Sequence, residues 1–325
     1  MRFLIIQTAF LGDVILASSV AEKLHHKFPD SQIDFLLKKG NEEVFEGHPF
    51  IKNILVLDKK HNKIKNILSL ARKVKSNQYD CIINLNRFGS SGFIVWRSKA
   101  KEKIGFDKNP FSFCYTKKIK HEIGNGKHET ERNHTLIADI TDSKPAKPKL
   151  YPSLKHIEAV KQYTKEKKYV CVAPASIWFT KQFSKEKWIE LIKELKNTSV
   201  YLIGSKNDID LCNYVIEKSK HGAIVNLAGK LSILETAALM QTAEMNYVND
   251  SAPLHIASAT NAPVTAIYCS TIPAFGFGPL SDRSIIIETK EKLDCRPCGL
   301  HGHTSCPKEH FKCSESIEIK NILNV

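Results

Sequence analysis

The chain has 325 residues, of which 42% are hydrophobic and 25% are charged, and its formal net charge is +14. This composition excludes disordered and fibrous proteins, and at roughly 150 residues per domain the length predicts two domains. The positive charge suits a polyanionic partner such as nucleic acid, an anionic membrane surface or a phosphorylated glycolipid, although a solvated lysine-rich surface gives the same balance.

The N-terminal apolar run is too short to cross a bilayer and lacks the basic flank and cleavage site of a signal peptide. No later stretch reaches the length of a membrane helix. We therefore expect a cytoplasmic protein, and we expect most of its nine cysteines to be reduced, buried thiols rather than disulfides.

The first 37 residues predict a strand, a loop, a helix and a second strand. Residues 3–6 are an unbroken apolar run, residues 14–24 have helical spacing, and residues 33–37 are apolar again. This is a βαβ unit, the repeating element of a parallel sheet covered by helices. Strands at 54–57 and 81–85 and a helix at 64–75 continue the pattern, and a helix is expected around residues 136–138.

Pro145, Pro148 and Pro152 mark a linker, so we predict domains at residues 1–152 and 153–325. The second half repeats the α/β pattern. Strands are predicted at 169–173, 200–203, 224–227, 245–248 and 264–268, with helices between them, one of which spans residues 233–241. Two such units should face each other across a cleft. Residues 317–325 are expected to form a last helix that packs back on the first domain.

Two loops of the first domain leave the carboxyl ends of strands, where open α/β sheets bind ligands. The first contains Gly12, which allows close backbone approach, and Asp13, which falls at a helix start. The second, residues 86–92, contains Arg87, which suits an anionic ligand. Local sequence alone favours Asp13 as a simple helix cap, because Asp is a preferred N-cap residue, and Arg87 as part of a plain loop.

Two stretches of the second domain also suit an anion. After the strand at 245–248, Asp250 and Ser251 precede a helix begun by Pro253, and the free amides of such a helix start favour a diphosphate. His255 follows one turn later. Lys181, after the strand at 169–173, can meet a phosphate as a point charge. Helix capping by Asp250 or Ser251 and an ordinary surface lysine are the competing interpretations.

Two nucleotide-binding fingerprints are missing. No G-x-G-x-x-G follows the first strand of either half, and no G-x-x-x-x-G-K-[ST] occurs. The sequence therefore does not favour an enzyme of hydride transfer or of nucleoside triphosphate hydrolysis.

Four motifs in order resemble glycosyltransferase family 9, the ADP-heptose:lipopolysaccharide heptosyltransferases, over nearly the whole chain. They are Leu11-Gly12-Asp13, Pro174-Ala175-Ser176 with Lys181 and Phe183-Ser184, residues 226–230, and residues 249–255. Ala252 departs from this pattern, since members often have Gly there. The resemblance implies a GT-B fold, with two Rossmann-like domains, the first for the acceptor and the second for the nucleotide-sugar.

The resemblance also implies the reaction, which is inverting, metal-independent transfer of heptose from ADP-heptose to a phosphorylated lipid A core acceptor at the inner membrane surface. Asp13 would be the general base and Lys181 would neutralise the leaving diphosphate. For the donor we expect Ser176, Asp250, Ser251, Ala252 and His255 as binding residues. For the acceptor we expect Gly12 and Arg87, because of their loops at the strand ends.

A cysteine cluster near the C-terminus has the spacing C-x2-C-x7-C-x6-C, formed by Cys295, Cys298, Cys306 and Cys313. Four thiolates can hold zinc or iron tetrahedrally, and such an ion would be structural. Reduced thiols on a loop are an equal alternative.

Two other functions remain open from the sequence. One is a family 9-like transferase with another sugar-nucleotide or a protein acceptor. The other is a nucleic-acid-binding protein, which ranks low because no helix-turn-helix or RNP pattern is present.

Overall fold

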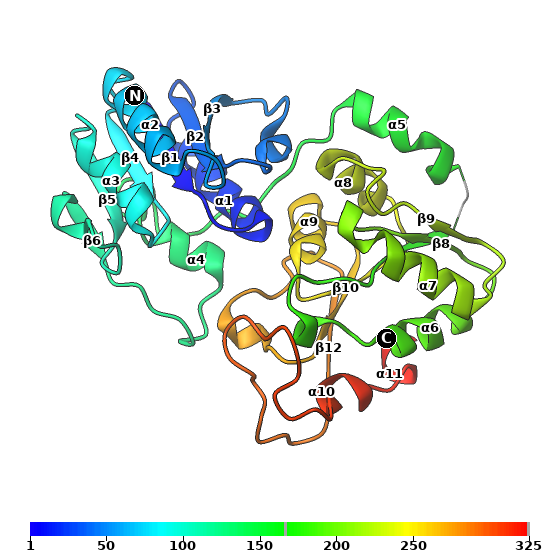
Figure 1. Cartoon of the computed structure of the whole chain (residues 1–325). Coiled ribbons are helices and arrows are strands. Elements are labelled where there is room, and N and C mark those ends of the chain that lie inside the picture. The colour runs from blue at the N-terminus through cyan, green and yellow to red at the C-terminus, as the bar shows by residue number, and fades with distance from the viewer. Residues whose placement is uncertain (166–167, 324–325) are drawn as a thin grey trace. The chain divides into compact units, whose positions relative to one another are not determined.

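The computed structural model describes residues 1–165 and 168–323, and these form two compact units, Met1–Tyr151 and Pro152–Val325. The division falls one residue before the predicted boundary. Each unit contains one six-stranded, fully parallel sheet with helices packed on it (Figure 1). Within the described residues, none of the helices combines the length and the apolar character needed to cross a bilayer.

The first sheet has the order β3-β2-β1-β4-β5-β6. Its strands are β1 (Arg2–Gln7), β2 (Gln32–Lys38), β3 (Ile51–Leu57), β4 (Cys81–Asn84), β5 (Glu102–Phe106) and β6 (Lys117–Ile119). The accompanying helices are α1 (Leu11–Lys27), α2 (Lys63–Ser76), α3 (Gly89–Arg97) and α4 (Glu129–His134), with 3-10 turns η1 (Glu42–Phe45) and η2 (Ser112–Cys114). The apolar side chains of β1 are fully buried, as the sequence predicts for a central parallel strand.

The second sheet has the order β12-β11-β10-β7-β8-β9. Its strands are β7 (Tyr169–Ala173), β8 (Ser199–Leu202), β9 (Ile224–Asn226), β10 (Met245–Asn249), β11 (Val264–Tyr268) and β12 (Ser284–Glu288). The helices are α5 (Leu154–Thr164), α6 (Lys185–Glu194), α7 (Ile209–Ser219), α8 (Ile233–Gln241), α9 (Ala252–Thr260), α10 (Lys312–Glu315) and α11 (Lys320–Leu323), with 3-10 turns η3 (Phe179–Lys181), η4 (Lys206–Asp208) and η5 (Pro273–Phe275).

The strand order gives each sheet one point where the chain reverses its direction of winding. In the first sheet β1 lies between β2 and β4, and in the second β7 lies between β8 and β10. Open α/β sheets bind ligands outside the carboxyl ends of the strands at such a point. The topology therefore selects the loops after β1, β4, β7 and β10.

Some predicted elements are wrong. Residues 89–92, predicted as loop, begin α3, where Gly92 is required because a Cβ would collide with the side chain of Asn109. The helix expected around 136–138 lies earlier, at α4, and residues 135–140 form turns. The chain end does not join the first unit, since Ile317 and Ile322 are buried in the core of the second. Residues 324–325 of that predicted helix lie outside the described range.

Candidate active site

The carboxyl edge of the first sheet is held by three amide side chains. The Gln7 Oε1 atom at the end of β1 accepts hydrogen bonds from the Ala9 amide (3.2 Å) and from Asn86 Nδ2 (2.7 Å). Asn109 Nδ2 donates to the carbonyl oxygens of Asn86 (2.9 Å) and Phe88 (3.1 Å). This network fixes the loop before α1 against the loop after β4, so the elements that carry Asp13 and Arg87 have a defined spacing.

Asp13 lies one turn inside α1 rather than at its N-cap. The N-cap is Phe10, and Asp13 Oδ2 accepts the Phe10 amide hydrogen at 3.1 Å. The capping interpretation is therefore correct in part, because the carboxylate does close the helix start. Gly12 is the second residue of the helix and has no positive φ, so it forms no tight turn. Asp13 remains half-exposed at the sheet edge where a ligand would lie.

A buried ion pair lies close to Asp13. Arg132 donates from Nε (2.9 Å) and Nη2 (2.8 Å) to Glu129 Oε2, and both side chains are at most one-tenth exposed. Burial raises the pKa of Glu129 to about 7, the charge of Arg132 opposes this, and the negative charge of Asp13 adds to it. Arg87, which is exposed, also acts on Glu129. Asp13, Arg87, Glu129 and Arg132 thus form one electrostatic cluster.

Three cations, Lys38, Lys59 and Arg87, lie at or just after the carboxyl ends of β2, β3 and β4. Lys38 Nζ lies 5.9 Å from the ring centre of Phe10, and Lys59 Nζ donates to the Thr8 carbonyl oxygen at 2.7 Å. Burial is the main cause that lowers the pKa of Lys59, to about 8. Together with Arg87, these lysines place positive charge around the loops beside Asp13. Sequence reasoning missed Lys38 and Lys59, and their position directly after two strands could have identified them.

In the second unit, Lys181 and Asp250 form an ion pair at the reversal point of the sheet. Lys181 Nζ lies 2.7 Å from Asp250 Oδ2, and the two side chains are 14% and 6% exposed. Thr271 Oγ1 donates to the same carboxylate oxygen at 2.6 Å. Two candidate residues from distant motifs therefore meet at one place, and Thr271, which follows β11, is a contact that the sequence reasoning missed.

Asn249 joins the two loops that carry this pair. Its Nδ2 donates to the carbonyl oxygens of Ala173, Pro174 and Ala175, and its Oδ1 accepts the Phe183 amide hydrogen at 2.8 Å. The side chain is fully buried. Because it ties the end of β10 to the segment 173–183, Asn249 fixes Lys181 relative to the start of α9.

The start of α9 has fewer donors for an anion than the sequence predicts. Ser251 is the N-cap in extended backbone and makes no capping hydrogen bond with its side chain, and Asp250 is engaged by Lys181 instead. The Leu254 amide donates to the Ser251 carbonyl oxygen at 3.0 Å, so it is not available to a ligand. The amides of Ser251 and Ala252 remain as donors of this helix start.

The two other predicted donor residues lie near this centre. His255 is 5% exposed, and its ring meets Phe277 edge-on at 6.2 Å between centres. Ser176 belongs to the loop after β7, and its carbonyl oxygen accepts a hydrogen bond from Gln182 Nε2 at 2.7 Å. That bond closes the loop that contains Lys181.

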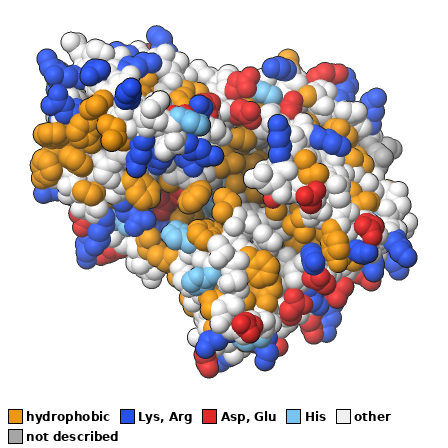
Figure 2. Space-filling view, viewed as in Figure 1, with side chains coloured by type: hydrophobic (Ala, Val, Ile, Leu, Met, Phe, Trp, Pro, Cys, Tyr) orange, Lys and Arg blue, Asp and Glu red, His pale blue; other side chains and the backbone are white. Residues whose placement is uncertain are grey.

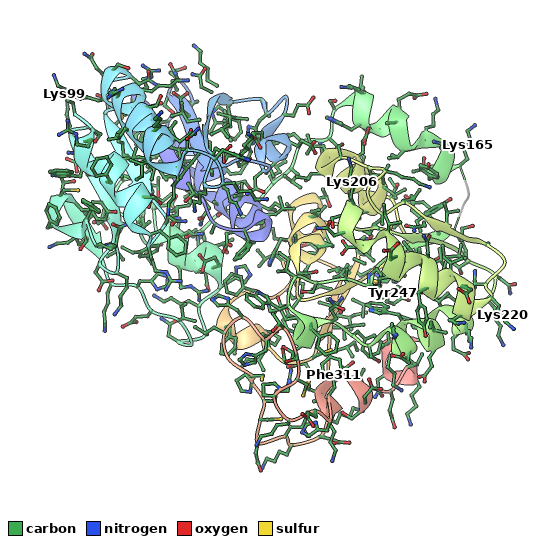
Figure 3. All side chains as sticks on the ribbon, viewed as in Figure 1. Lys99, Lys165, Lys206, Lys220, Tyr247 and Phe311 are labelled. Carbon is green, nitrogen blue, oxygen red and sulfur yellow. The ribbon has the colours of Figure 1, made fainter. Side chains whose placement is uncertain are left out.

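The cysteine-rich segment packs against the turn that carries Lys181. The Thr180 amide donates to the His303 carbonyl oxygen at 3.1 Å, and the His303 amide donates to Thr180 Oγ1 at 2.8 Å. Gly302 has a φ of +75°, and a Cβ there would lie 2.8 Å from Thr180 Oγ1. Phe311, labelled in Figure 3, stacks on Phe179 at 5.0 Å. This segment therefore supports η3.

The four clustered cysteines share one small pocket. Cys295, Cys298, Cys306 and Cys313 line it together with His310, whose Nε2 lies 3.9 Å from Cys295 Sγ. Burial raises the pKa of Cys313 to about 11, which favours the neutral thiol when no ion is bound. Across the described part of the chain, no three His, Cys, Asp or Glu side chains are arranged to hold a metal ion. Zinc or iron at this pocket stays a prediction.

Comparison with known proteins agrees with this geometry. The sequence profile of glycosyltransferase family 9 (heptosyltransferase) matches residues 67–304, well over half of the chain. The chain belongs to glycosyltransferase family 9. The resemblance carried by the four motifs is thus confirmed, and the protein is a glycosyltransferase.

Relatives of this family 9 glycosyltransferase match over most of their length. Lipopolysaccharide heptosyltransferase 1 of Campylobacter coli is 26% identical over 319 residues, which is 90% of this chain and 91% of the relative. A solved family 9 glycosyl transferase from Veillonella parvula superposes with a TM-score of 0.81 at 20% identity, over 100% of this chain and 97% of the other. The ADP-heptose lps heptosyltransferase II of E. coli gives 0.78 at 19% identity, over 92% and 96%. The predicted GT-B class is confirmed.

Proposed function

We propose that this family 9 glycosyltransferase moves a heptose from ADP-heptose to an inner-core sugar of lipopolysaccharide, with inversion and without a catalytic metal ion. The observation that carries the proposal is the contact between Lys181 and Asp250 at the start of α9. A cation, a fixed carboxylate and a helix N-terminus lie together at the edge where the second sheet binds ligands.

The second unit would bind the donor and stabilise its leaving group. When the bond between the sugar and the diphosphate breaks, negative charge grows on the diphosphate. The ammonium of Lys181 and the amides of Ser251 and Ala252 would meet this charge. Asp250, held by Thr271 at 2.6 Å, would orient Lys181, and His255 and Ser176 would contact the nucleotide-sugar.

The first unit would bind the acceptor and activate its hydroxyl. Asp13 would take the hydroxyl proton, so that the acceptor oxygen attacks the anomeric carbon as the bond to the diphosphate breaks. One displacement without a covalent enzyme intermediate inverts the configuration. Lys38, Lys59 and Arg87 stand around the loop beside Asp13, and their charges suit the phosphates of a lipid A core acceptor, with Gly12 leaving room near the reacting oxygen.

The printed names of the relatives support the donor and the class of acceptor. The E. coli structure is that of an ADP-heptose enzyme, and the Campylobacter coli relative is a lipopolysaccharide heptosyltransferase. One relative is named heptosyltransferase 1 and the other heptosyltransferase II. Similarity to both therefore does not identify the position in the core at which the heptose is added. We propose transfer without a metal ion because the ammonium of Lys181 and the start of α9 can meet the charge of the diphosphate.

A thermal-shift series with ADP, ADP-heptose, UDP-glucose and NAD tests the donor, because a ligand that binds only the folded protein raises its melting temperature. We expect ADP and ADP-heptose to stabilise the chain, and Lys181→Ala to lose most of that effect while the exposed Lys193→Ala on α6 keeps it. Stabilisation by NAD or UDP-glucose but not by ADP-heptose would contradict the proposal. Transfer to truncated core acceptors then identifies the acceptor.

A further inference from the structure

Four aromatic side chains, none of them assigned to the reaction, form a cluster on the surface of the first unit. They are Phe93 and Trp96 of α3 and Phe111 and Phe113 around η2. The ring centres of Phe93, Trp96 and Phe111 lie 5.7 to 5.9 Å apart, and Phe113 lies 5.9 Å from Phe111. Trp96 is 43% and Phe113 is 67% exposed. We call this set the aromatic patch.

A neighbouring helix adds apolar surface. Helix α2 packs beside α3 and exposes Ile64 (75%) and Leu68 (40%). Figure 2 shows hydrophobic side chains gathered over this end of the first unit, with Lys and Arg side chains around them. Contiguous exposed apolar surface with a polar border marks an interaction site more often than a free surface.

The charge of the chain is concentrated in the same segment. Residues 59–120 contain sixteen Lys and Arg against three Asp and Glu, a net charge of +13 out of +14 for the whole chain. Arg97 lies 5.7 Å from the Trp96 ring centre, and Lys99, labelled in Figure 3, and Lys101 follow it on the exposed surface. Arg97 therefore borders the aromatic patch, and the positive charge of the chain is concentrated in the segment that carries the patch.

We propose that the aromatic patch and its lysine border dock the first unit on an anionic lipid bilayer. Trp and Phe side chains enter the boundary between headgroups and acyl chains, while Lys and Arg meet lipid phosphates outside it. Each cation near an anionic bilayer adds to binding, and two kinds of contact together give stable association where one does not. A second copy of this chain fits the surface poorly, because it would bring two strongly positive segments together.

This docking concerns where the enzyme works and does not depend on which sugar it transfers. It gives the first unit a lipid surface beside the edge that we assign to a lipid-linked acceptor. The test therefore uses vesicles that contain no acceptor, so that membrane binding and transfer succeed or fail separately.

Vesicle sedimentation of the full chain tests the proposal, with phosphatidylcholine alone and with phosphatidylcholine mixed with phosphatidylglycerol. We expect binding to the mixed vesicles, weakened by salt and weak on phosphatidylcholine alone. Trp96→Ser with Phe113→Ser, and separately Lys99→Glu with Lys101→Glu, should each reduce binding by about tenfold or more. The matched controls lie on the second unit, Leu154→Ser with Ile157→Ser and Lys193→Glu with Lys196→Glu, and should bind like the unaltered chain.

Two further readouts separate docking from loss of structure and from other partners. All variants should keep the melting temperature and the response to ADP, and Trp96→Phe should abolish a blue shift of tryptophan emission on vesicle binding. Equal binding of the aromatic variant and the unaltered chain overturns the proposal. So does failure to bind the mixed vesicles, binding of nucleic acid through this patch without vesicle binding, or a dimer in light scattering that the patch variants dissociate while vesicle binding persists.

Discussion

The Lys181 ammonium lies 2.7 Å from the Asp250 carboxylate, although 69 residues separate them in the chain. Both groups are largely shielded from water, and buried charges of this kind are retained when they are paired and hydrogen-bonded. The pair holds a cation at the edge of the second sheet. An arriving diphosphate then meets a charge that is already in position.

The first prediction concerns this pair. Lys181→Ala removes the charge that meets the leaving group, and we expect kcat/KM for transfer to fall by about 10²- to 10³-fold, as for loss of one strong transition-state contact. Lys193→Ala on the exposed face of α6 is the matched control and should leave kcat/KM unchanged. Steady-state kinetics check this, and a Lys181→Ala variant within threefold of normal would remove Lys181 from the reaction.

A second prediction concerns the buried Glu129–Arg132 pair beside Asp13. Glu129→Gln leaves the buried Arg132 without its counter-charge, so the free energy of unfolding should fall by about 3 kcal/mol. The double variant Glu129→Met with Arg132→Leu should recover much of this loss, because it leaves no unpaired buried charge. Urea unfolding of the unaltered chain and of these two variants measures the change. A double variant no more stable than Glu129→Gln would argue that the loss does not come from an unpaired Arg132.

A third prediction concerns acid stability. Burial lowers the pKa of His48 from its ordinary value near 6.5 to about 4, and the charges of His25 and Lys149 act in the same direction. Between these values the unfolded chain binds more protons than the folded chain. The contribution of His48 to the free energy of unfolding is therefore complete above pH 6.5 and is lost as the pH falls towards 4. The slope from this residue is at most about 1.4 kcal/mol per pH unit.

His48→Phe tests that slope. Phe keeps the aromatic packing against Phe50 and Tyr151 but cannot titrate, although it leaves the Ile51 amide without the acceptor Nδ1. We expect a lower free energy of unfolding at pH 7 and a flatter dependence between pH 6.5 and 4. An unchanged slope would show that other groups cause the acid sensitivity.

A fourth prediction concerns the cysteine pocket. If zinc or iron binds there, elemental analysis of the purified protein should find about one ion per chain, and Cys295→Ser with Cys298→Ser should lose it. That variant should also lower the affinity for ADP, because the segment supports the turn of Lys181 through Thr180 and His303. The buried, isolated Cys171→Ser is the control for a changed thiol count. Metal-free protein that binds ADP normally would make the metal prediction wrong.

Much of the fold follows from local sequence because central parallel strands are apolar runs. Strands β1, β4, β7 and β10 are predicted this way, as is α8, whose observed bounds Ile233–Gln241 equal the predicted ones. Strands β5 and β6 escape prediction. Both are short and contain lysines, so their apolar content resembles that of a loop. Helix α5 escapes because only His156 and Val160 of its side chains are buried, which leaves little apolar periodicity.

The candidate site shows the same limit. Asp13, Lys181 and Asp250 stand in recognisable motifs, and their places at strand ends follow from topology. Thr271 and Glu129 could not be assigned, because their roles depend on contacts across 21 and 116 residues of chain that no local pattern encodes. Residues that act by holding another side chain carry no sequence signal of their own.

The most direct test of the proposed reaction is Asp13→Asn. Asn keeps an oxygen that can accept the Phe10 amide hydrogen, now 3.1 Å from Oδ2, so the start of α1 should be preserved while the base is lost. Calorimetry should find ADP-heptose affinity within about threefold of normal, and single-turnover transfer should fall by about 10²- to 10⁴-fold. Asp30→Asn, an exposed carboxylate in the same unit, should transfer normally. Transfer by Asp13→Asn at a near-normal rate would contradict Asp13 as the base.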